Sequence, residues 1–430
     1  WEVFRAEAHR ALDMALDFVR DRQHEAVWQE PPRSLKVADQ SLPSAGQPIG
    51  EVVDAVRSDV MPFTLGNTHP RFWGWVNGSG TPSGIISQSL VGALNANLGG
   101  RDHSPIHVER QLLAWMRELF GYPEDAGGLI CTGTSYATLM ALAVARQNVL
   151  GESVREQGNG DAALVAYCSQ QAHVSVSKAM EMLGLGSRAL RSVPVAPDYT
   201  LDTAALELLI QQDIDNGLKP FAVISSVGAV NTGAIDDIEA IGEICKLRGL
   251  WHHVDGAFGA LIVLSAELRH RLMGIEHADS IAFDFHKWMH VTYAAGCLLV
   301  KDGNLHRRSF ATSHAYLREE SRGVAAEAPW PCDFGIDLSR GFAALGVWML
   351  LKEMGTQRLG DAIYRNCRQA AWLGKQLEAL PQFELLAPVS LNIVCFRFAP
   401  AGPGEHQLDR LNRDILVALH CEGIAVPSAT

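Results

Sequence analysis

The side chain best placed to do chemistry is Lys287, in the segment FDFHKW at residues 283–288, directly after an apolar stretch typical of a strand. Lysine is rarely buried in such a place unless it is paired or used. Burial and nearby positive charge lower the pKa of an amine, and a neutral amine can form an imine with an aldehyde. The structural alternative is more common for a lysine taken alone. In it, the aliphatic part of the side chain packs on apolar surface and the ammonium group lies in water.

Asp255 ends an earlier apolar segment, WHHVD, and is followed by the small residues of GAFG. A carboxylate in this position can approach the edge of a flat heteroaromatic ring and hold a proton on its ring nitrogen. A protonated ring accepts the electrons of a developing carbanion. The structural alternative is an aspartate that caps the turn or helix after a strand.

Thr134 and Ser135 belong to the segment CTGTS, which precedes a predicted helix. Backbone N–H groups, hydroxyls and the positive end of the helix dipole would suit a phosphate there, although Ser and Thr are also ordinary helix caps. His173, in QAHVSVS, follows a strand that ends near Tyr167 and could stack on a planar cofactor or lie in an exposed loop. These features occur at successive strand ends, which favours one cofactor site.

The elements that must position these residues are apolar strands alternating with helices. Such a pattern predicts an α/β fold, an open and mostly parallel sheet with helices on both faces. Ligands bind beyond the carboxyl ends of the strands in these sheets, where all the residues above fall. The predicted strands are 128–131, 163–167, 221–226, 250–255, 280–284 and 296–301.

The predicted organisation has three parts: an N-terminal helical arm over 1–83, a large cofactor-binding domain over 84–309, and a loop with an α+β C-terminal domain over 310–430. We expect the last part to be incomplete. The arm should pack on another domain or subunit. Within the outer parts the periodicity predicts helices over 1–29, 51–60, 339–353, 359–380 and 406–420, a strand over 391–398, and a mobile loop over 310–335.

Composition limits the partners and the compartment. The formal net charge of -12 argues against nucleic-acid binding, which needs a basic face. The 8 cysteines are scattered without a CxxC pair, which is typical of reduced thiols. No apolar run approaches the roughly 20 residues of a membrane span, and the first residues lack the pattern of a signal peptide. We therefore expect a cytoplasmic protein without membrane or nucleic-acid partners.

In these motifs the chain resembles the group II pyridoxal-phosphate (PLP) decarboxylases, the family of the aromatic-amino-acid, glutamate and diaminobutyrate decarboxylases. The resemblance covers nearly the whole chain, and the aspartate and lysine segments are specific in combination. It is carried by HPRF at 69–72, TSYAT at 134–138, Ala172-His173, residues 228–236, HVD at 253–255 and HKW at 286–288.

The resemblance implies the fold of the aspartate aminotransferases (fold type I) and an interlocked homodimer, with the arm wrapped around the partner. It also implies a role for each matching residue, with an L-amino acid as the substrate. Lys287 would form the Schiff base and Asp255 would hold the pyridine nitrogen. His173 would stack on one face of the ring and Ala257 would pack on the other. The remaining implied contacts are Thr134, Ser135 and His286 at the phosphate, and Trp75, Val76 and Asn77 along the substrate side chain.

The sequence departs from the family in the loop expected at 318–334, which contains no tyrosine. Family members carry a loop tyrosine that protonates the carbanion after carbon dioxide leaves. His314, Tyr316 or water could take its place. Two smaller departures are Ala229-Val230 in place of paired threonines and Asp284 where many members have asparagine.

Several alternatives stay open. The same scaffold could catalyse aldehyde synthesis, transamination or carbon–carbon lysis, and the missing loop tyrosine favours such a reaction. A metal site from His286 with His290, or from His252 and His253 with Asp255, lacks the glutamate of an HExxH motif and a convincing third ligand, so no metal is expected. A non-catalytic relative would fit poorly with the full set of cofactor-directed residues. For the substrate, Trp73 and Trp75 favour an aromatic or apolar amino acid, Arg71 could meet a distal carboxylate, and a diamino acid is not excluded.

Overall fold

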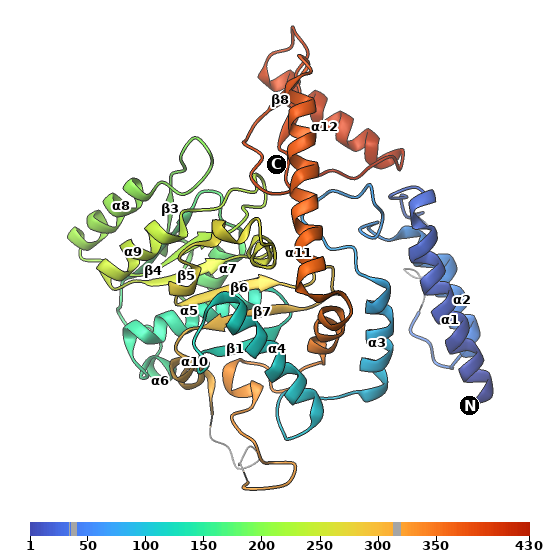
Figure 1. Cartoon of the computed structure of the whole chain (residues 1–430), viewed down its shortest axis with the longest axis horizontal. Helices are drawn as coiled ribbons and strands as arrows, with labels where there is room; N and C mark the ends of the chain where they lie inside the picture. The colour runs from blue at the N-terminus through green and yellow to red at the C-terminus, as the bar shows by residue number, and fades with distance from the viewer. Residues whose placement is uncertain (34, 36–40, 313–319) are drawn as a thin grey trace.

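The computed structural model describes residues 1–33, 35, 41–312 and 320–430. A seven-stranded sheet forms its centre, with strand order β1-β7-β6-β5-β4-β2-β3 (Figure 1). The strands from β6 to β3 are parallel to one another, and β7 runs antiparallel to both of its neighbours. The predicted α/β fold with a mostly parallel sheet is confirmed. The strand bounds are β1 Gly127–Cys131, β2 Leu164–Ser169, β3 Leu190–Val193, β4 Lys219–Ser226, β5 Trp251–Asp255, β6 Ser280–Asp284 and β7 Gly296–Val300.

Two features of the sheet differ from the sequence-based expectation. The edge strand β3 was not predicted, because its segment LRSV is only partly buried and lacks a long apolar run. The direction of β7 was not predicted either. A strand covered on both faces is apolar throughout, so its sequence does not reveal whether it runs parallel or antiparallel to its neighbours.

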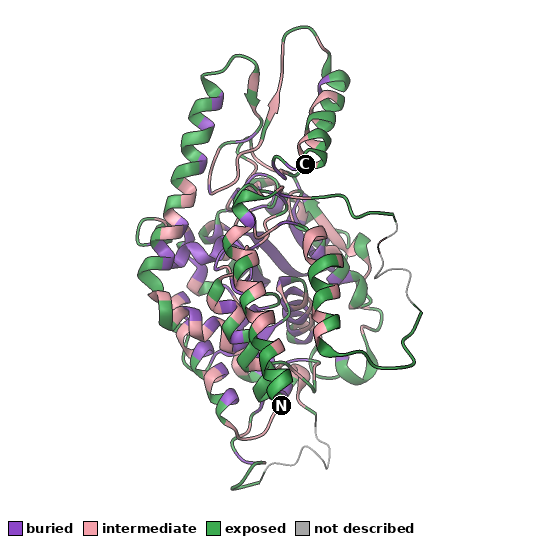
Figure 2. Ribbon diagram, turned by 90° about the vertical axis from the view of Figure 1, so that its right-hand side faces the viewer, coloured by how far each residue is buried: buried purple, intermediate pink, exposed green. Residues whose placement is uncertain are grey.

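Helices cover both faces of the sheet, and the buried residues gather between these layers (Figures 1 and 2). On one face, α5 and α7 pack on the central strands. On the other, α8 and α9 cover β2 and β4, while α4, the 3-10 segment η5 and part of α11 cover β6 and β7. The bounds are α4 Ser104–Phe120, α5 Thr134–Leu150, α6 Val154–Gln157, α7 Ser175–Met182, α8 Thr203–Asp215, α9 Ile238–Arg248, η5 Gly259–Leu264 and α10 Gly303–Phe310.

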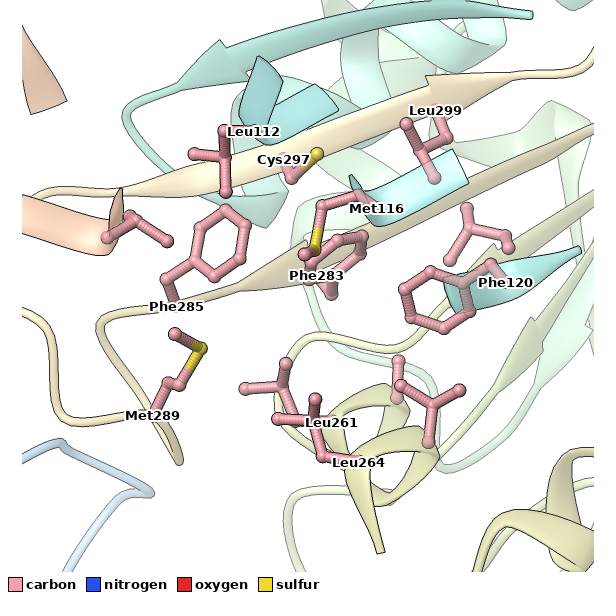
Figure 3. Packing of buried hydrophobic residues seen from close by; sticks show 14 of the residues in the cluster. Leu112, Met116, Phe120, Leu261, Leu264, Phe283, Phe285, Met289, Cys297 and Leu299 are labelled. Atoms are coloured by element: carbon pink, nitrogen blue, oxygen red, sulfur yellow. The ribbon is translucent and has the colours of Figure 1, made fainter. Parts of the chain in front are cut away.

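The core beside β6 fixes the end of that strand (Figure 3). Phe283 and Phe285 point to the α4 side, because side chains of a strand alternate between its faces. Phe283 packs on Phe120 of α4 with ring centroids 5.0 Å apart, and on Phe285 at 5.2 Å. Burying each phenylalanine contributes about 2–3 kcal/mol. The same alternation turns Asp284 and His286 towards the opposite face, where α5 begins.

The N-terminal segment consists of α1 Glu2–Asp21, α2 Ile49–Asp59 and α3 Pro82–Leu94. In Figure 1, α1 and α2 lie side by side at the periphery, next to α3. Within the described ranges, no helix has the length and hydropathy to cross a membrane.

The C-terminal segment contains the long helix α11, Ala343–Glu378, whose Gly355 has a non-helical φ of 69°. The predicted helices over 339–353 and 359–380 are the two parts on either side of this glycine. Antiparallel β8 Phe383–Leu385 and β9 Phe396–Phe398 follow, and then α12 Glu405–Cys421. The predicted strand over 391–398 is therefore wrong in its first half, because Leu391 packs into the core as irregular chain beside Gly228 and Gly233.

Candidate active site

The sheet brings the candidate site residues to one edge. Asp255 is in register with Ala282 of β6 and Ser226 of β4, and Asp284 with Gly296. Cys131, at the end of β1, also faces Gly296. The carboxyl ends of β1, β4, β5 and β6 therefore meet the amino end of β7 at one edge, where Asp255 ends β5, Lys287 follows β6 and α5 begins after β1.

Lys287 lies in the turn after β6 and is 24% exposed. Its Nζ is 3.3 Å from Oδ2 of Asp284, a side chain that is almost fully buried. The turn is packed closely against the segment around Gly78, where an added Cβ would lie 2.0 Å from the carbonyl oxygen of His286. The lysine is thus a partly exposed amine on a rigid turn, and not a solvated surface side chain.

Asp255 is a buried carboxylate at the end of β5, and its Oδ1 accepts a hydrogen bond from the N–H of Ala257 at 3.1 Å. Burial raises the pKa of Asp255, whereas Lys287, the Ala257 hydrogen bond and His173 lower it to a smaller extent. Such a carboxylate is favoured in its charged form by an adjacent cation, and a protonated pyridine nitrogen is a cation of this kind.

His173 lies in the turn between β2 and α7, and its ring is exposed. Its Nδ1 accepts a hydrogen bond from the N–H of Ser175 at 3.3 Å and lies 2.8 Å from the Ser175 hydroxyl oxygen. The N–H donor leaves Nε2 as the protonated nitrogen of the neutral ring. Ser175, at the start of α7, therefore fixes the orientation of this flat side chain.

The start of α5 provides donors for an anion. Gly133, its N-cap residue, supplies no side-chain cap. The hydroxyl of Thr134 is buried and, among the described residues, has no hydrogen-bond partner, and Ser135 is exposed. A helix N-terminus with free hydroxyls favours a phosphate group. The donor set therefore fits the phosphate of PLP.

His286 lies beside this helix start and is buried. Its Nδ1 accepts a hydrogen bond from the N–H of Ala295 at 3.1 Å, and its Nε2 lies 3.7 Å from Oδ2 of Asp284. Burial lowers the pKa of His286, while Asp284 opposes this effect. The residues predicted for the phosphate thus lie together, and Asp284 lies among them.

The predicted substrate wall, residues 75–77, lies on the segment that packs against the lysine turn. Trp75 is about half exposed, at 51%, and its backbone N–H donates to the hydroxyl of Ser428 at 3.2 Å. Val76 packs on the core, and Asn77 Oδ1 accepts a hydrogen bond from the hydroxyl of Tyr293 at 2.9 Å. Trp73 and Arg71 of the same segment are exposed.

Tyr293 was not predicted from the sequence. Besides contacting Asn77, it packs on His286 with ring centroids 4.4 Å apart and the ring planes tilted by 40°. It also lines a pocket of about 610 Å³ together with Asn67, Ser79 and Thr292, among others. The tyrosine thereby joins the substrate segment to the phosphate residues. Its position shortly after Lys287 was the only sequence signal, because its partners come from distant parts of the chain.

The histidines of the alternative metal site make other contacts. His252 Nε2 lies 2.8 Å from the hydroxyl oxygen of Ser225, and His253 Nδ1 lies 2.8 Å from that of Ser280. In the part of the chain that the structure describes, no three His, Cys, Asp or Glu residues are grouped to hold a metal. His314 and Tyr316, the candidate replacements for the loop tyrosine, lie outside the described residues.

Comparisons with known proteins identify the family of the chain. The family model described as "Pyridoxal-dependent decarboxylase conserved domain" matches residues 31–399. An aromatic-L-amino-acid decarboxylase of Bacillus atrophaeus is 28% identical over 100% of this chain and 89% of its own length. A phenylacetaldehyde synthase of Petunia hybrida is 29% identical over 92% of this chain and 80% of its own.

Among solved structures, the chain is similar to Oryza sativa TDC with PLP and tryptamine, with a TM-score of 0.92 and 26% identity. The match covers 100% of this chain and 91% of that one. The likeness extends over the whole sheet and both outer segments. The chain therefore belongs to the pyridoxal-dependent decarboxylase family, enzymes whose cofactor is PLP.

Proposed function

We propose that the protein decarboxylates an L-amino acid to the corresponding amine and carbon dioxide, using PLP held by Lys287 as a Schiff base. The observation that carries this proposal is the placement of the partly exposed Lys287 amine at the same sheet edge as the buried Asp255 carboxylate. The family membership and the names of the relatives support it.

When bound, PLP supplies a protonated aromatic ring that accepts the electron pair of the bond that breaks at the substrate Cα. In our proposal, Asp255 keeps the ring nitrogen protonated, and His173 and Ala257 hold the two ring faces. Thr134, Ser135 and His286 bind the phosphate. Trp75, Val76 and Asn77 line the substrate side chain, and Tyr293 fixes the position of Asn77.

The proposed substrate is an aromatic L-amino acid. The half-exposed indole of Trp75 offers a flat apolar surface on the segment whose Gly78 packs against the lysine turn. The relatives include an aromatic-L-amino-acid decarboxylase of Bacillus atrophaeus and an L-tyrosine/L-DOPA decarboxylase of Lophophora williamsii. Of the substrate classes left open by the sequence, the aromatic one is favoured by both observations.

A second candidate reaction is aldehyde synthesis. The segment 318–334 contains no tyrosine, and phenylacetaldehyde synthases of Petunia hybrida and Arabidopsis thaliana are among the relatives. In this reaction the amino acid, dioxygen and water give an aldehyde, carbon dioxide, ammonia and hydrogen peroxide. The amine carbon is oxidised and dioxygen is reduced to the peroxide, so oxygen consumption distinguishes the two reactions.

The deciding experiment incubates the PLP-loaded protein, in air, with a pool of L-amino acids and identifies the products by mass spectrometry. Amines that are lighter than a consumed amino acid by one carbon dioxide support decarboxylation and name the substrate. Aldehydes formed with peroxide support the second candidate. Keto acids would contradict both.

Lys287→Ala is the matching variant. It should lose both the visible absorbance of the Schiff base and turnover, because no other amine replaces Nζ at this position. Lys178→Ala, which removes an exposed lysine from α7, is the control and should change neither. Full activity of Lys287→Ala with a normal spectrum would sink the proposal.

We also propose that the chain works as a homodimer, with residues 1–83 as the dimerisation arm, 84–309 as the PLP domain and 310–430 as the loop and small domain. The outer helices expose apolar side chains, among them Phe4 on α1, Val56 on α2 and Leu90 on α3. A second copy would cover them, and light scattering should then give twice the mass of the chain.

A cytoplasmic location is a further part of this proposal. All 8 cysteines lie in the described ranges, and none of these forms a disulfide. Free thiols at this frequency are typical of a reducing compartment.

A further inference from the structure

The carboxylate of Asp284 lies at the centre of the proposed phosphate site. Its Oδ1 accepts a hydrogen bond from the backbone N–H of Thr134, the first residue of α5, at 2.8 Å. Its Oδ2 lies 3.3 Å from Nζ of Lys287 and 3.7 Å from Nε2 of His286. One buried negative charge thus contacts the helix start, the Schiff-base lysine and the histidine proposed for the phosphate.

This carboxylate is held in place from all sides. The backbone N–H of Asp284 donates to the carbonyl oxygen of Ala257 at 2.9 Å. A Cβ added at Gly296 would lie 2.7 Å from Asp284 Oδ1 and 2.6 Å from the Cα of Gly133. The side chain is only 3% exposed. Because the side chain is buried and its Oδ1 accepts the hydrogen bond of the Thr134 N–H, we expect its charge to stay at the start of α5 when an anion binds there.

The start of α5 also keeps donors that Asp284 does not use. The Thr134 hydroxyl is buried and, within the described chain, makes no hydrogen bond, and the N-cap residue Gly133 has no side chain to cap the helix. These groups favour an anion independently of the helix dipole. Asp284 is therefore an anion of the protein itself at a site that favours a bound anion, and it contacts Thr134 and His286, two of the residues proposed to bind that anion.

We propose that Asp284 sets the affinity of this protein for its cofactor by repelling the phosphate group, so that the protein holds PLP more weakly than it would with a neutral side chain at this position. A phosphate monoester carries a charge of about -1.5 to -2 near neutral pH. Like charges within a few ångströms of each other in a poorly solvated site repel each other, and the repulsion costs an appreciable free energy. The proposal rests on the assignment of the phosphate to Thr134 and Ser135. Its consequence is that occupancy of the enzyme follows the concentration of free PLP.

The test compares Asp284→Asn with the wild type. The amide retains an oxygen acceptor for the Thr134 N–H and a similar shape, but it removes the charge. The dissociation constants of PLP, of inorganic phosphate and of pyridoxal, which has the aldehyde but no phosphate, are measured by fluorescence quenching of the apoprotein. Removing one like charge should lower the dissociation constant of PLP by about tenfold, which corresponds to about 1.4 kcal/mol of binding free energy. The dissociation constant of inorganic phosphate should also fall, and that of pyridoxal should stay unchanged.

Two controls keep the result interpretable. Asp161→Asn removes the same charge from an exposed site ahead of β2, at the opposite edge of the sheet, and should leave all three constants unchanged. Asp284→Ser removes the charge with a smaller side chain. It should also lower the dissociation constant of PLP and leave that of pyridoxal unchanged. This variant replaces Asp284→Asn in the test if circular dichroism shows that Asp284→Asn does not fold.

Two results would overturn the proposal. PLP affinity could remain equal or fall in the neutral variants while pyridoxal binds normally. Alternatively, PLP and pyridoxal could weaken together, which would mean that Asp284 acts by holding Lys287 and not on the phosphate. The cofactor site is checked separately by borohydride reduction of the PLP-loaded wild type. The reduction should leave the cofactor covalently attached to Lys287. If it is not attached there, the proposed cofactor site is wrong, and the affinity proposal is wrong as well.

Discussion

At the scale of single residues, the buried carboxylate of Asp255 lowers the stability of the protein without cofactor and favours a cation beside it. Burial raises the pKa of Asp255, so the ionised form is disfavoured in the protein without cofactor. An acid whose folded-state pKa is raised lowers the stability as the pH rises through that pKa. The cost at neutral pH is offset only when a positive charge lies next to the carboxylate, and this is the function that we propose for the cofactor nitrogen.

Asp255→Asn should therefore act in opposite directions on the two forms of the protein. The melting temperature of the apoprotein should rise above that of the wild type at pH 8, because a buried charge is removed. The additional stabilisation by PLP should shrink, and turnover should fall by about a hundredfold or more, as when one preorganised electrostatic contact is removed. Differential scanning fluorimetry with and without PLP checks the first two, and steady-state kinetics the third. An apoprotein that is destabilised at pH 8 would contradict this account.

At the scale of elements, the site depends on the close approach of two segments that are distant in the sequence. The segment 73–79 packs on the turn of Lys287 with only a glycine between the two backbones. A Cβ at Gly78 would lie 2.0 Å from the His286 carbonyl oxygen and 2.7 Å from that of Lys287. These oxygens are backbone atoms and cannot rotate away, so the two segments would have to separate.

Gly78→Ala should consequently lower the free energy of unfolding by about 1–3 kcal/mol, the usual range for overpacking, and weaken the Schiff-base absorbance. The matched control is Gly92→Ala in α3, where an added Cβ meets nothing within 4 Å. In a helix, alanine is favoured over glycine by up to about 1 kcal/mol, so the control should be neutral or stabilising. Urea unfolding and absorbance spectra measure both. Equal behaviour of the two variants would show that the approach at Gly78 is not tight.

At the scale of the whole molecule, the centre of the sheet contains neutral histidines that make it sensitive to acid. Burial lowers the pKa of His252 to about 4 and that of His253 to about 3. Both side chains contact hydroxyl groups and lie on β5, which carries Asp255 at its end. In the unfolded chain histidine titrates near 6.5.

The sign of the pH effect follows from these values. The unfolded state takes up protons first as the pH falls below about 6.5, so the free energy of unfolding should decrease towards pH 4, by up to about 1.4 kcal/mol per pH unit for each histidine. Asp236, whose pKa burial raises to about 6, contributes the opposite slope. The comparison is therefore made between the wild type and His252→Gln, by urea unfolding of the apoprotein at pH 7.5, 6 and 5. Parallel pH profiles of the two proteins would rule out His252 as a source of the acid sensitivity.

The sequence predicted those parts of the candidate site that depend on the position of a residue after a strand. Asp255 and Lys287 each follow an apolar strand, and parallel strands deliver their carboxyl ends to a common edge. That rule predicted their proximity without any knowledge of the pairing order. The antiparallel direction of β7, the edge strand β3 and the irregular chain at Leu391 could not be predicted, because each depends on which segments pack against it.

The sequence by itself determined the residue types of the site, the α/β class and the family, because these depend on local apolar patterns and on motifs that carry their own chemistry. The tertiary structure alone decided which groups share a contact: the Tyr293 hydroxyl with Asn77, the Gly78 backbone with the lysine turn, and Asp284 with Thr134, Lys287 and His286. The physical reason is that hydrogen bonds and charge interactions act over a few ångströms. Distances of this kind between segments far apart in the chain are set by the packing of the whole core.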